Sequence, residues 1–394
     1  MDKIEEVLTR GVEKIYPSQE ALEKILRQGQ KLRIYQGFDP SMSNLHLGNY
    51  VGLLKLRQFQ KLGHEVIFLV GDFTGMIGDP TDKLAARRML TREEVLKNTQ
   101  NWKEQAGRIL AFKGENPAKV MFNSAWNDKI SFKDLIEITA SFTVQQMIER
   151  DMFQKRLQMG KPIYLSEFLY PVAQAIDSVK MNVDLEIGGS DQTFNMLMGR
   201  HLMQVLKGKE KFVLTTKLLV DSQGQKVGKT TGNALFLNSS PEQLYGGIMS
   251  FPDDVIVLGF EILTEVPFIR EEIEKEVAKD PMRAKKRLAF EVVRVLWGEE
   301  AAQKAQLEFE KTFQKREFPQ EIPEIKVHRQ KITMSDLLVE NKLVSSMSEA
   351  KRLIKNGAVD FDGQTIRDPK EEVLLKNGSV IKIGKAKFIK IKII

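Results

Sequence analysis

Hydrophobic residues in the first 80 positions follow a pattern that predicts a strand, a helix and a second strand. The strands are predicted over 32–37 and 64–70, where apolar residues are dense. Between them, apolar residues recur at helical spacing, at Leu47, Val51, Leu54 and Leu62. We expect Ser43 or Asn44 to cap this helix and Gly63 to end it. Because strand, helix and strand at this spacing are typical of a parallel sheet, the pattern predicts an α/β fold.

Outside this unit, the chain up to about residue 316 is predicted to be mainly helical, with one further strand, and short alternating strands with two helices are predicted in the tail. At the N-terminus, a single helical face would carry Ile4, Val7, Leu8, Val12 and Ile15. Residues 131–200 are mostly helical in pattern, with glycine- and proline-bearing breaks at 160–162 and 188–189. Residues 213–220 predict a strand that leads into a Gly-Lys loop, and a helical pattern runs from 241 to about 316.

The 394 residues favour two or three domains, and changes of pattern suggest where they divide. We expect a Rossmann-like parallel-sheet domain over 1–235, with a helical insertion at about 110–170. An α-helical domain would follow over 236–317. Pro- and Glu-bearing residues 318–330 read as a linker to a small α+β domain over 331–394.

The net charge of +7 is unevenly distributed along the chain. Residues 331–394 hold 13 Lys/Arg and 8 Asp/Glu, so +5 of that charge lies in the last 64 residues. A basic terminal module is typical of nucleic-acid binding, although a merely solvated surface would carry the same charge.

Several classes of protein are disfavoured by composition. The chain has no cysteine, which excludes disulfides and thiolate zinc sites. Its four histidines lack metal-ligand spacing, so we expect no metal site built from protein side chains. No apolar run approaches the length of a membrane span, and the acid-bearing N-terminus does not resemble a signal peptide. We therefore expect a cytoplasmic protein with no membrane partner.

Candidate ligand-binding residues gather where the predicted strands end. Asp39, His46 and Asp79 all follow predicted strands, and ligands of parallel sheets bind outside the carboxyl ends of the strands. His46 begins the motif HLGN at a helix N-terminus, where free backbone N–H groups favour anions. Gly48 and Gly52 leave one helix face bare, so an adenine ring could lie against it. Taken alone, the motif would equally describe a capped helix with packing glycines.

A second motif, KVGKT over 226–230, suggests a loop that binds phosphates. Lys226 and Lys229 flank Gly228 and could close over a departing pyrophosphate, although a solvated Lys/Gly turn has the same composition. Lys83 and Arg87 could reach the same phosphates or form an ordinary exposed basic face. The two motifs together suggest that ATP is held from two sides and cleaved between its α- and β-phosphates.

Five motifs in this order carry a specific resemblance. The segments IYQGFDPSMSNLHLGN, IGDP, YPVAQAID, GGSDQ and KVGKT resemble bacterial tyrosyl-tRNA synthetases, which are class I aminoacyl-tRNA synthetases. The tail segment SMSEAKRLIKNGAVDFDGQTI resembles an S4 RNA-binding domain, so the resemblance covers the whole chain. It implies a tyrosine–tRNA ligase that uses ATP with Mg²⁺, binds tRNA(Tyr) and forms a homodimer through the helical insertion. The domain over 236–317 would bind the anticodon.

The resemblance also implies residue roles. The tyrosine substrate would be bound by Tyr35, Asp79, Tyr170, Gln174, Asp177 and Gln192. The nucleotide would be bound by Gly37, Asp39, Gly48, Asp191 and Lys229. Catalysis would depend on His46, Asn49, Lys83, Arg87, Lys226, Lys229 and Thr230. RNA would contact Lys351, Arg352 and Lys355.

Among the tyrosine-binding residues, Tyr35 and Asp177 would bracket the phenol. Tyr170, Gln174 and Asp79 would hold the ammonium group. Independently of the resemblance, Gln174 and Asp177 lie three residues apart and so share a helix face. Pro171 would either begin that helix, leaving Tyr170 at its edge, or kink it.

The sequence departs from the family pattern at a few positions. Asn49 replaces a frequent histidine, and its amide can bind a ribose but cannot titrate. Glu186 stands where one large branch has glutamine, so hydrogen bonding near the amino acid should differ. Thr193 replaces a tryptophan, which leaves the branch open. A tryptophanyl-tRNA synthetase and a catalytically silent RNA-binding relative are the two alternatives.

Two further interpretations concern the insertion and the tail. In the insertion, either dimer contact or core packing would explain the apolar segment around Ser141, Phe142, Val144, Met147 and Ile148. In the tail, Ser346 or Ser348 would cap a helix whose three cations suit an RNA backbone or a plain exposed face.

Overall fold

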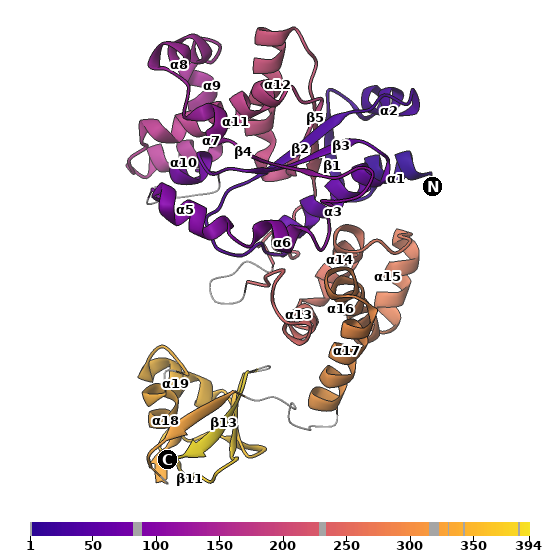
Figure 1. Ribbon diagram of the computed structural model, residues 1–394. Helices are drawn as coiled ribbons and strands as arrows, with labels where there is room; N and C mark the ends of the chain where they lie inside the picture. The colour runs from indigo at the N-terminus through magenta and orange to yellow at the C-terminus, as the bar shows by residue number, and fades with distance from the viewer. Residues whose placement is uncertain are drawn as a thin grey trace. The chain divides into compact units, whose positions relative to one another are not determined.

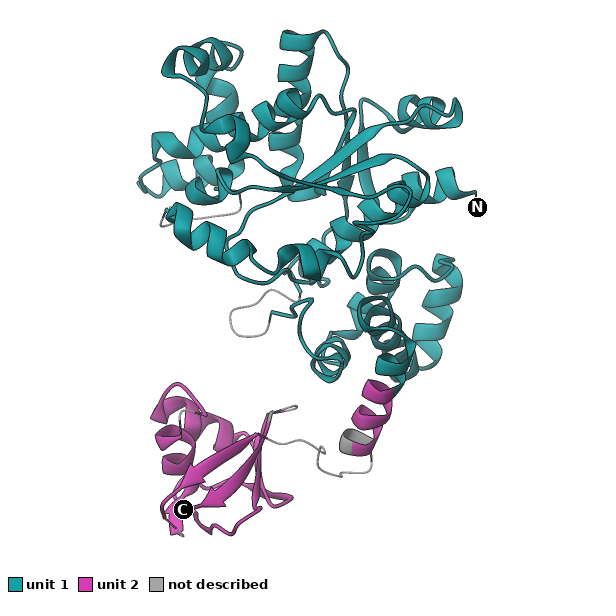
Figure 2. Ribbon diagram, viewed as in Figure 1, with its two compact units in different colours: residues 1–303 teal, residues 304–394 magenta. Residues whose placement is uncertain are grey.

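The computed structural model describes residues 2–81, 89–227, 234–314, 323–329, 331–341, 343–384 and 387–394. The chain forms two compact units, residues 1–303 and 304–394 (Figure 2). The predicted boundary at residue 236 lies inside the first unit.

A parallel sheet forms the centre of the first unit (Figure 1). Within the described residues it has six strands in the order β1-β6-β5-β2-β3-β4, and only the β1–β6 pair is antiparallel. The strands are β1 (Val12–Tyr16), β2 (Arg33–Phe38), β3 (Glu65–Val70), β4 (Lys119–Phe122), β5 (Leu185–Gly189) and β6 (Phe212–Thr216). This sheet confirms the predicted α/β fold.

Strand β5 was not predicted, because Gly188 and Gly189 read as a break in a helical pattern. It lies in the middle of the sheet, between β6 and β2. A Cβ at Gly188 would lie 2.9 Å from Met196 Sδ, so glycine allows the next helix, α12 (Thr193–Lys207), to approach the strand closely.

The N-terminal helix is shorter than predicted. Helix α1 (Lys3–Thr9) ends before Gly11, which has a φ of +65°, a conformation that glycine adopts without strain. Val12 and Ile15 therefore lie in β1 and do not continue the helical face.

Of two other predicted helix boundaries, the first is wrong and the second loses one of its two alternatives. Helix α3 (Leu47–Lys61) is capped by His46 and not by Ser43 or Asn44. Helix α11 (Leu165–Met181) contains Pro171 in its interior, so the proline does not begin the helix and Tyr170 is not at its edge.

Helices cover both faces of the sheet, with α3 on one side and α11 and α12 on the other (Figure 1). Because side chains alternate along a strand, Tyr35 of β2 faces α11 whereas Gln36 faces Gly52 of α3. The shorter helical elements here are α2 (Gln19–Arg27), α4 (Thr74–Ile77), α5 (Arg92–Thr99), α6 (Trp102–Ala106), α7 (Ser124–Asn127), α8 (Phe132–Thr139), α9 (Val144–Ile148), α10 (Asp151–Gln158) and the 3-10 helix η1 (Ser190–Gln192).

A helical region follows the sheet, as the apolar pattern predicted. Its elements are α13 (Pro241–Met249), the 3-10 helix η2 (Asp253–Val255), α14 (Ile256–Leu263), α15 (Arg270–Lys279), α16 (Pro281–Trp297) and α17 (Glu299–Gln314). The buried guanidinium of Arg10 joins this region to α1. It donates to the carbonyls of Phe260 at 2.9 Å, Glu261 at 3.1 Å and Thr264 at 2.7 Å, which lie at the end of α14.

The second unit ends in a small α+β fold. Its strands are β7 (Glu324–Val327), β8 (Lys331–Thr333), β9 (Val359–Phe361), β10 (Gln364–Ile366), β11 (Glu372–Leu374), β12 (Val380–Ile383) and β13 (Lys387–Ile393). Five of the strands described here pair in the order β10-β9-β12-β13-β7, while β8 pairs with β11. Helices α18 (Met334–Glu340) and α19 (Met347–Lys355) pack against a shared apolar core.

Candidate active site

A cavity of about 610 Å³ opens at the carboxyl end of the sheet. It lies beyond the last residues of β2 and β5, where parallel α/β sheets bind their ligands. The structure brings thirteen of the predicted residues to its wall: Tyr35, Gly37, Asp39, His46, Gly48, Asn49, Asp79, Tyr170, Gln174, Asp177, Asp191, Gln192 and Lys226. Lys83, Arg87, Lys229 and Thr230 lie outside the described residues.

Asp177 of α11 is held in the cavity wall by three uncharged donors. Its Oδ1 accepts from Trp126 Nε1 at 2.7 Å and from Asn127 Nδ2 at 3.0 Å. Its Oδ2 accepts from Asn123 Nδ2 at 3.1 Å. Burial raises the pKa of Asp177 to about 8, although the three donors act in the opposite direction. Within the part of the chain that the structure describes, Asp177 has no salt bridge, so the site fixes a carboxyl group in place through uncharged donors.

Tyr35 lies fully buried on β2, with its hydroxyl 2.9 Å from Ser178 Oγ of α11. Burial raises the pKa of Tyr35 well above its ordinary value, and the carboxylates of Glu186 and Asp177 add to the effect. The phenol consequently keeps its proton and remains a hydrogen-bond donor at neutral pH.

Tyr170 and Gln174 lie one helical turn apart on α11 and bind acidic side chains. Tyr170 Oη donates to Asp39 Oδ2 at 2.7 Å, while Thr74 Oγ1 donates to the other oxygen of Asp39, also at 2.7 Å. Gln174 Nε2 donates to Glu186 Oε1 at 2.9 Å. The helix thus presents a row of polar groups to the cavity.

Asp79 and Gln192 meet from distant parts of the chain. Gln192 Nε2 donates to Asp79 Oδ2 at 2.6 Å, and the backbone and hydroxyl of Thr81 donate to Asp79 Oδ1. The pair joins the segment after β3 to the 3-10 helix after β5, so two of the predicted motifs converge here.

His46 and Asn49 form a reciprocal cap at the start of α3. His46 Nδ1 accepts from the backbone N–H groups of Gly48 at 3.0 Å and Asn49 at 3.4 Å. Asn49 Oδ1 accepts from the backbone N–H of His46 at 3.0 Å. Because Nδ1 is an acceptor, the neutral ring carries its proton on Nε2, and the site gains a donor there.

Lys226 binds the second signature loop to the sheet. Its Nζ lies 2.7 Å from Asp191 Oδ2, and its backbone forms a bridge with Val220. The lysine is thus joined to the aspartate of the GGSDQ motif.

The sequence pattern did not identify two groups of residues that build the wall. Asn123, Trp126 and Asn127 follow β4 directly in the segment MFNSAWN, and polar residues after an apolar strand are the signal that could have found them. Ser178 and Lys211 have no comparable signal, because Ser178 directly follows Asp177 and Lys211 ends the charged run KGKEK over 207–211. Across the described residues, no group of three or more His, Asp or Glu side chains could hold a metal ion.

Two known protein families match consecutive parts of this chain. The family described as tRNA synthetases class I (W and Y) matches residues 27–314. A second family, the tyrosine–tRNA ligase SYY-like C-terminal domain, matches residues 314–391. The fold and the cavity thus belong to a class I aminoacyl-tRNA synthetase.

Individual relatives show which family within this class the chain resembles. The tyrosine–tRNA ligases of Thermotoga maritima and Aquifex aeolicus are 44% and 41% identical to this chain, over 98% of its length and 96% and 97% of theirs. A C-terminally truncated mitochondrial tyrosyl-tRNA synthetase of Coccidioides posadasii is 25% identical with a TM-score of 0.65, over 78% of this chain and 91% of that one. The chain therefore belongs to the tyrosine–tRNA ligase family, which confirms the predicted resemblance.

Proposed function

We propose that this tyrosine–tRNA ligase performs both steps of its reaction at the 610 Å³ cavity. In the first step, the carboxylate of tyrosine attacks the α-phosphorus of ATP, a P–O bond to tyrosine forms, and pyrophosphate leaves. In the second, the terminal ribose hydroxyl of tRNA(Tyr) attacks the tyrosyl carbonyl, and AMP leaves. Neither step needs an enzyme nucleophile, so the protein contributes by orienting reactants and stabilising charge.

The tyrosine substrate would lie along α11. Its phenol would bind between Tyr35 and Asp177, and its ammonium group would bind near Asp79, Tyr170 and Gln174. The carboxyl groups of Asp79 and Asp39 support this orientation of the bound tyrosine, because carboxylates stabilise a cation in a partly buried site. Gln192, which donates to Asp79, would hold that carboxylate in position.

The nucleotide would lie over the start of α3. Gly48 and Gly52 both line the cavity, which supports this placement, but the expected bare face beside Gly52 is occupied by the Gln36 side chain. Gly37, Asp39 and Asp191 would line the ribose side. His46 would donate from Nε2 to phosphate oxygens.

Cations of two loops would assist pyrophosphate departure. Lys226 would exchange its ion pair with Asp191 for the phosphates, together with Lys229 and Thr230 of the same loop. Lys83 and Arg87 would contribute further positive charge. Mg²⁺ would enter with ATP, bound by its phosphate oxygens, which are the hard ligands that this ion prefers.

The hydrogen bonds around Asp177 are the observation on which tyrosine is proposed as the substrate amino acid. A buried carboxyl with three N–H donors and no cationic partner suits the O–H of a phenol, and phenylalanine would leave it without that donor. Tryptophan has no hydroxyl to bind there, which disfavours the tryptophanyl alternative. A silent RNA-binding relative would lack the His46 cap and the Lys226 contact.

Exchange of labelled pyrophosphate into ATP, tested with twenty amino acids in turn, checks this function. Among the twenty amino acids, we expect exchange with tyrosine to exceed exchange with any other by orders of magnitude. The Asp177→Ala protein should lose tyrosine-dependent exchange but still bind ATP. Wild-type exchange with tryptophan, or unchanged exchange in a folded Asp177→Ala protein, would contradict the assignment.

The tRNA partner would be bound by the second unit and by the helical region over 236–317. Lys351, Arg352 and Lys355 support this, because all three are exposed on α19 while Ala350 and Ile354 of the same helix are buried. The predicted linker over 318–330 would join the RNA-binding part over 331–394 to the catalytic domain over 1–235, although its residues 324–327 form β7, which pairs with β13 and belongs to the sheet of the second unit.

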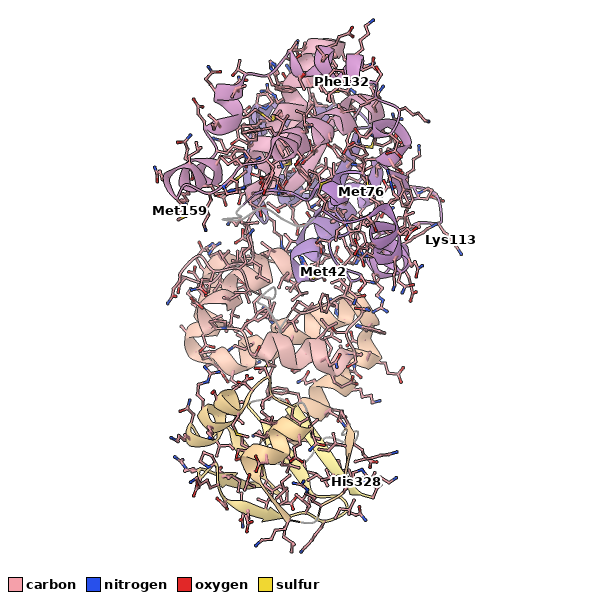
Figure 3. The ribbon with its side chains drawn as sticks, turned by 90° about the vertical axis from the view of Figure 1, so that its left-hand side faces the viewer. Met42, Met76, Lys113, Phe132, Met159 and His328 are labelled. Carbon is pink, nitrogen blue, oxygen red and sulfur yellow. The ribbon has the colours of Figure 1, made fainter. Side chains whose placement is uncertain are left out.

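A homodimer would form through the insertion at about 110–170. Exposed apolar side chains support this surface: Phe132, Ile136, Val144, Leu157, Met159 and Leu165. Figure 3 labels Phe132 and Met159 at the edge of this part of the molecule. Met147, by contrast, is buried in the core of one chain.

We place the protein in the cytoplasm, where tRNA and ATP are available. The described residues contain no helix with the length and apolar character that crossing a bilayer requires.

A further inference from the structure

Four side chains form a buried polar chain that runs from the cavity wall into the protein, and of these only Tyr35 has a role in the function proposed above. They are Tyr35, Ser178, Glu186 and Lys211, and none is more than 2% exposed. Lys211 Nζ donates to Ser178 Oγ at 2.8 Å, to the carbonyl of Met196 at 3.1 Å and to Glu186 Oε2. The ammonium group thus directs its three hydrogens to three acceptors.

Gly199 of α12 makes room for this chain. A Cβ at Gly199 would lie 2.6 Å from Lys211 Nζ and 2.8 Å from Ser178 Oγ. A buried cation is tolerated only when it is paired and hydrogen-bonded, and Glu186 provides the pairing here. Gln174 binds the other oxygen of Glu186, so the carboxylate is held from both sides.

A cation at one end fixes the direction of the hydrogen bonds. An ammonium group has no lone pair, so Ser178 Oγ must accept from Lys211 and has one hydrogen left to donate. Two acceptors are within reach of that hydrogen, Tyr35 Oη at 2.9 Å and Glu186 Oε2 at 3.4 Å. Glu186 already accepts from Lys211 and Gln174, and the bond to Tyr35 is shorter. Tyr35 Oη then accepts from Ser178, and its own hydrogen is left to donate elsewhere.

We propose that Lys211 and Ser178 are positioning residues that make the Tyr35 hydroxyl a donor toward the phenolic oxygen of bound tyrosine. The inference rests on the proposed tyrosine site. In the complex, donation would run from Lys211 through Ser178 and Tyr35 to the substrate oxygen, whose own hydrogen would go to Asp177. A hydroxyl both accepts and donates and completes this chain. The ring hydrogen of phenylalanine at this position neither accepts nor donates. The aromatic amine of 4-aminophenylalanine donates but accepts poorly.

The Ser178→Ala protein tests the proposal, with Ser166→Ala on the same helix as a matched control. Pyrophosphate exchange would be measured with tyrosine and phenylalanine. Loss of one hydrogen bond should lower kcat/KM for tyrosine about 10-fold while leaving that for phenylalanine and the KM for ATP unchanged. The tyrosine-to-phenylalanine ratio should therefore fall about 10-fold, and Ser166→Ala should keep it.

A double variant, Lys211→Met with Glu186→Gln, removes both charges together and keeps the test available if Ser178→Ala fails to fold. Without the cation, Ser178 is free to reverse its donation, so relative activity with 4-aminophenylalanine should rise about 10-fold against tyrosine. Ratios that stay at the wild-type values in the folded variants would overturn the proposal. Wild-type protein that gives no tyrosine-dependent exchange would instead refute the proposed function, which separates the two failures.

Discussion

Single residues in the cavity are bound to one another. Asp39 accepts from Tyr170 and Thr74, and Asp79 accepts from Gln192. Such contacts hold the side chains in the orientation that a substrate needs, which lowers the entropy cost of binding. Asn49 shows how a departure from the family pattern is accommodated, since its side-chain oxygen completes the cap that His46 begins.

Tyrosine binding should tighten as the pH rises toward 8. The pKa of Asp177 is raised to about 8 by burial, so below that pH the carboxyl of the free protein holds a proton. That proton must leave before the carboxylate can accept from the phenol, so binding is coupled to its release. The Kd for tyrosine, measured by calorimetry from pH 6.5 to 8.5, should fall by up to ~10-fold per pH unit below 8 and then level off. We expect the Kd for ATP not to vary over this range. A Kd for tyrosine that did not vary either would contradict the role of Asp177.

At the scale of elements, α1 and α3 are joined by a buried lysine. Lys55 of α3 donates to the carbonyls of Val7 at 2.9 Å and Arg10 at 2.8 Å, at the end of α1. These carbonyls lack partners within their own helix, so Lys55 acts as a C-terminal cap supplied by another element. Burial lowers the pKa of Lys55 to about 7.

The Lys55→Met protein should lose ~1–3 kcal/mol of stability, because two buried carbonyls lose their donor. Lys61→Met on the same helix is the control, since its salt bridge with Glu265 is exposed and such pairs contribute at most ~1 kcal/mol. Urea unfolding measures both. Equal losses in the two variants would show that the Lys55 contacts do not stabilise the fold.

Much of the fold could be predicted from the distribution of apolar residues, because β2 and β3 are dense apolar segments and apolar residues of α3 recur at helical spacing. The motifs also indicated which residues gather at the sheet edge. Strand β5 was missed, since its paired glycines serve close packing against Met196 and read as a break.

The contacts beneath the site could not be predicted, because sheet register creates them. Glu186 and Lys211 are 25 positions apart, and they meet because β5 pairs in parallel with β6, with Glu186 opposite Val213. Asp177 meets Trp126 across 51 positions. No local pattern in the sequence indicates either of these two contacts.

At the scale of the whole molecule, chemistry and RNA binding are assigned to different units. On this proposal, adenylate formation would need only the cavity of the first unit, whereas charging of tRNA would also need the exposed cations of the second. The two activities can therefore be separated by mutation.

Replacing Lys351, Arg352 and Lys355 together by alanine should weaken tRNA charging at least 10-fold and flatten its salt dependence, because three phosphate contacts would be lost. Pyrophosphate exchange should not change. Alanine at the exposed Lys370 and Lys376 of the same unit is the control. Equal loss of exchange and charging would indicate a structural role for α19.

The proposed homodimer would depend on the exposed apolar surface of the insertion. The double variant Phe132→Glu with Val144→Glu places charge on side chains that are 79% and 70% exposed and should give a monomer in sedimentation velocity. Ile269→Glu, at an apolar side chain 52% exposed outside the insertion, should leave the dimer intact. A dimeric double variant would exclude this surface.

In the proposed tyrosine site, the phenol of the substrate is bound between β2 and α11. A crystal structure with bound tyrosine tests this site most directly. We predict that the phenolic oxygen lies within hydrogen-bond distance, roughly 2.6–3.2 Å, of both Tyr35 Oη and an Asp177 carboxyl oxygen. Tyrosine bound with its ring elsewhere, or with its hydroxyl in contact with neither residue, would contradict it.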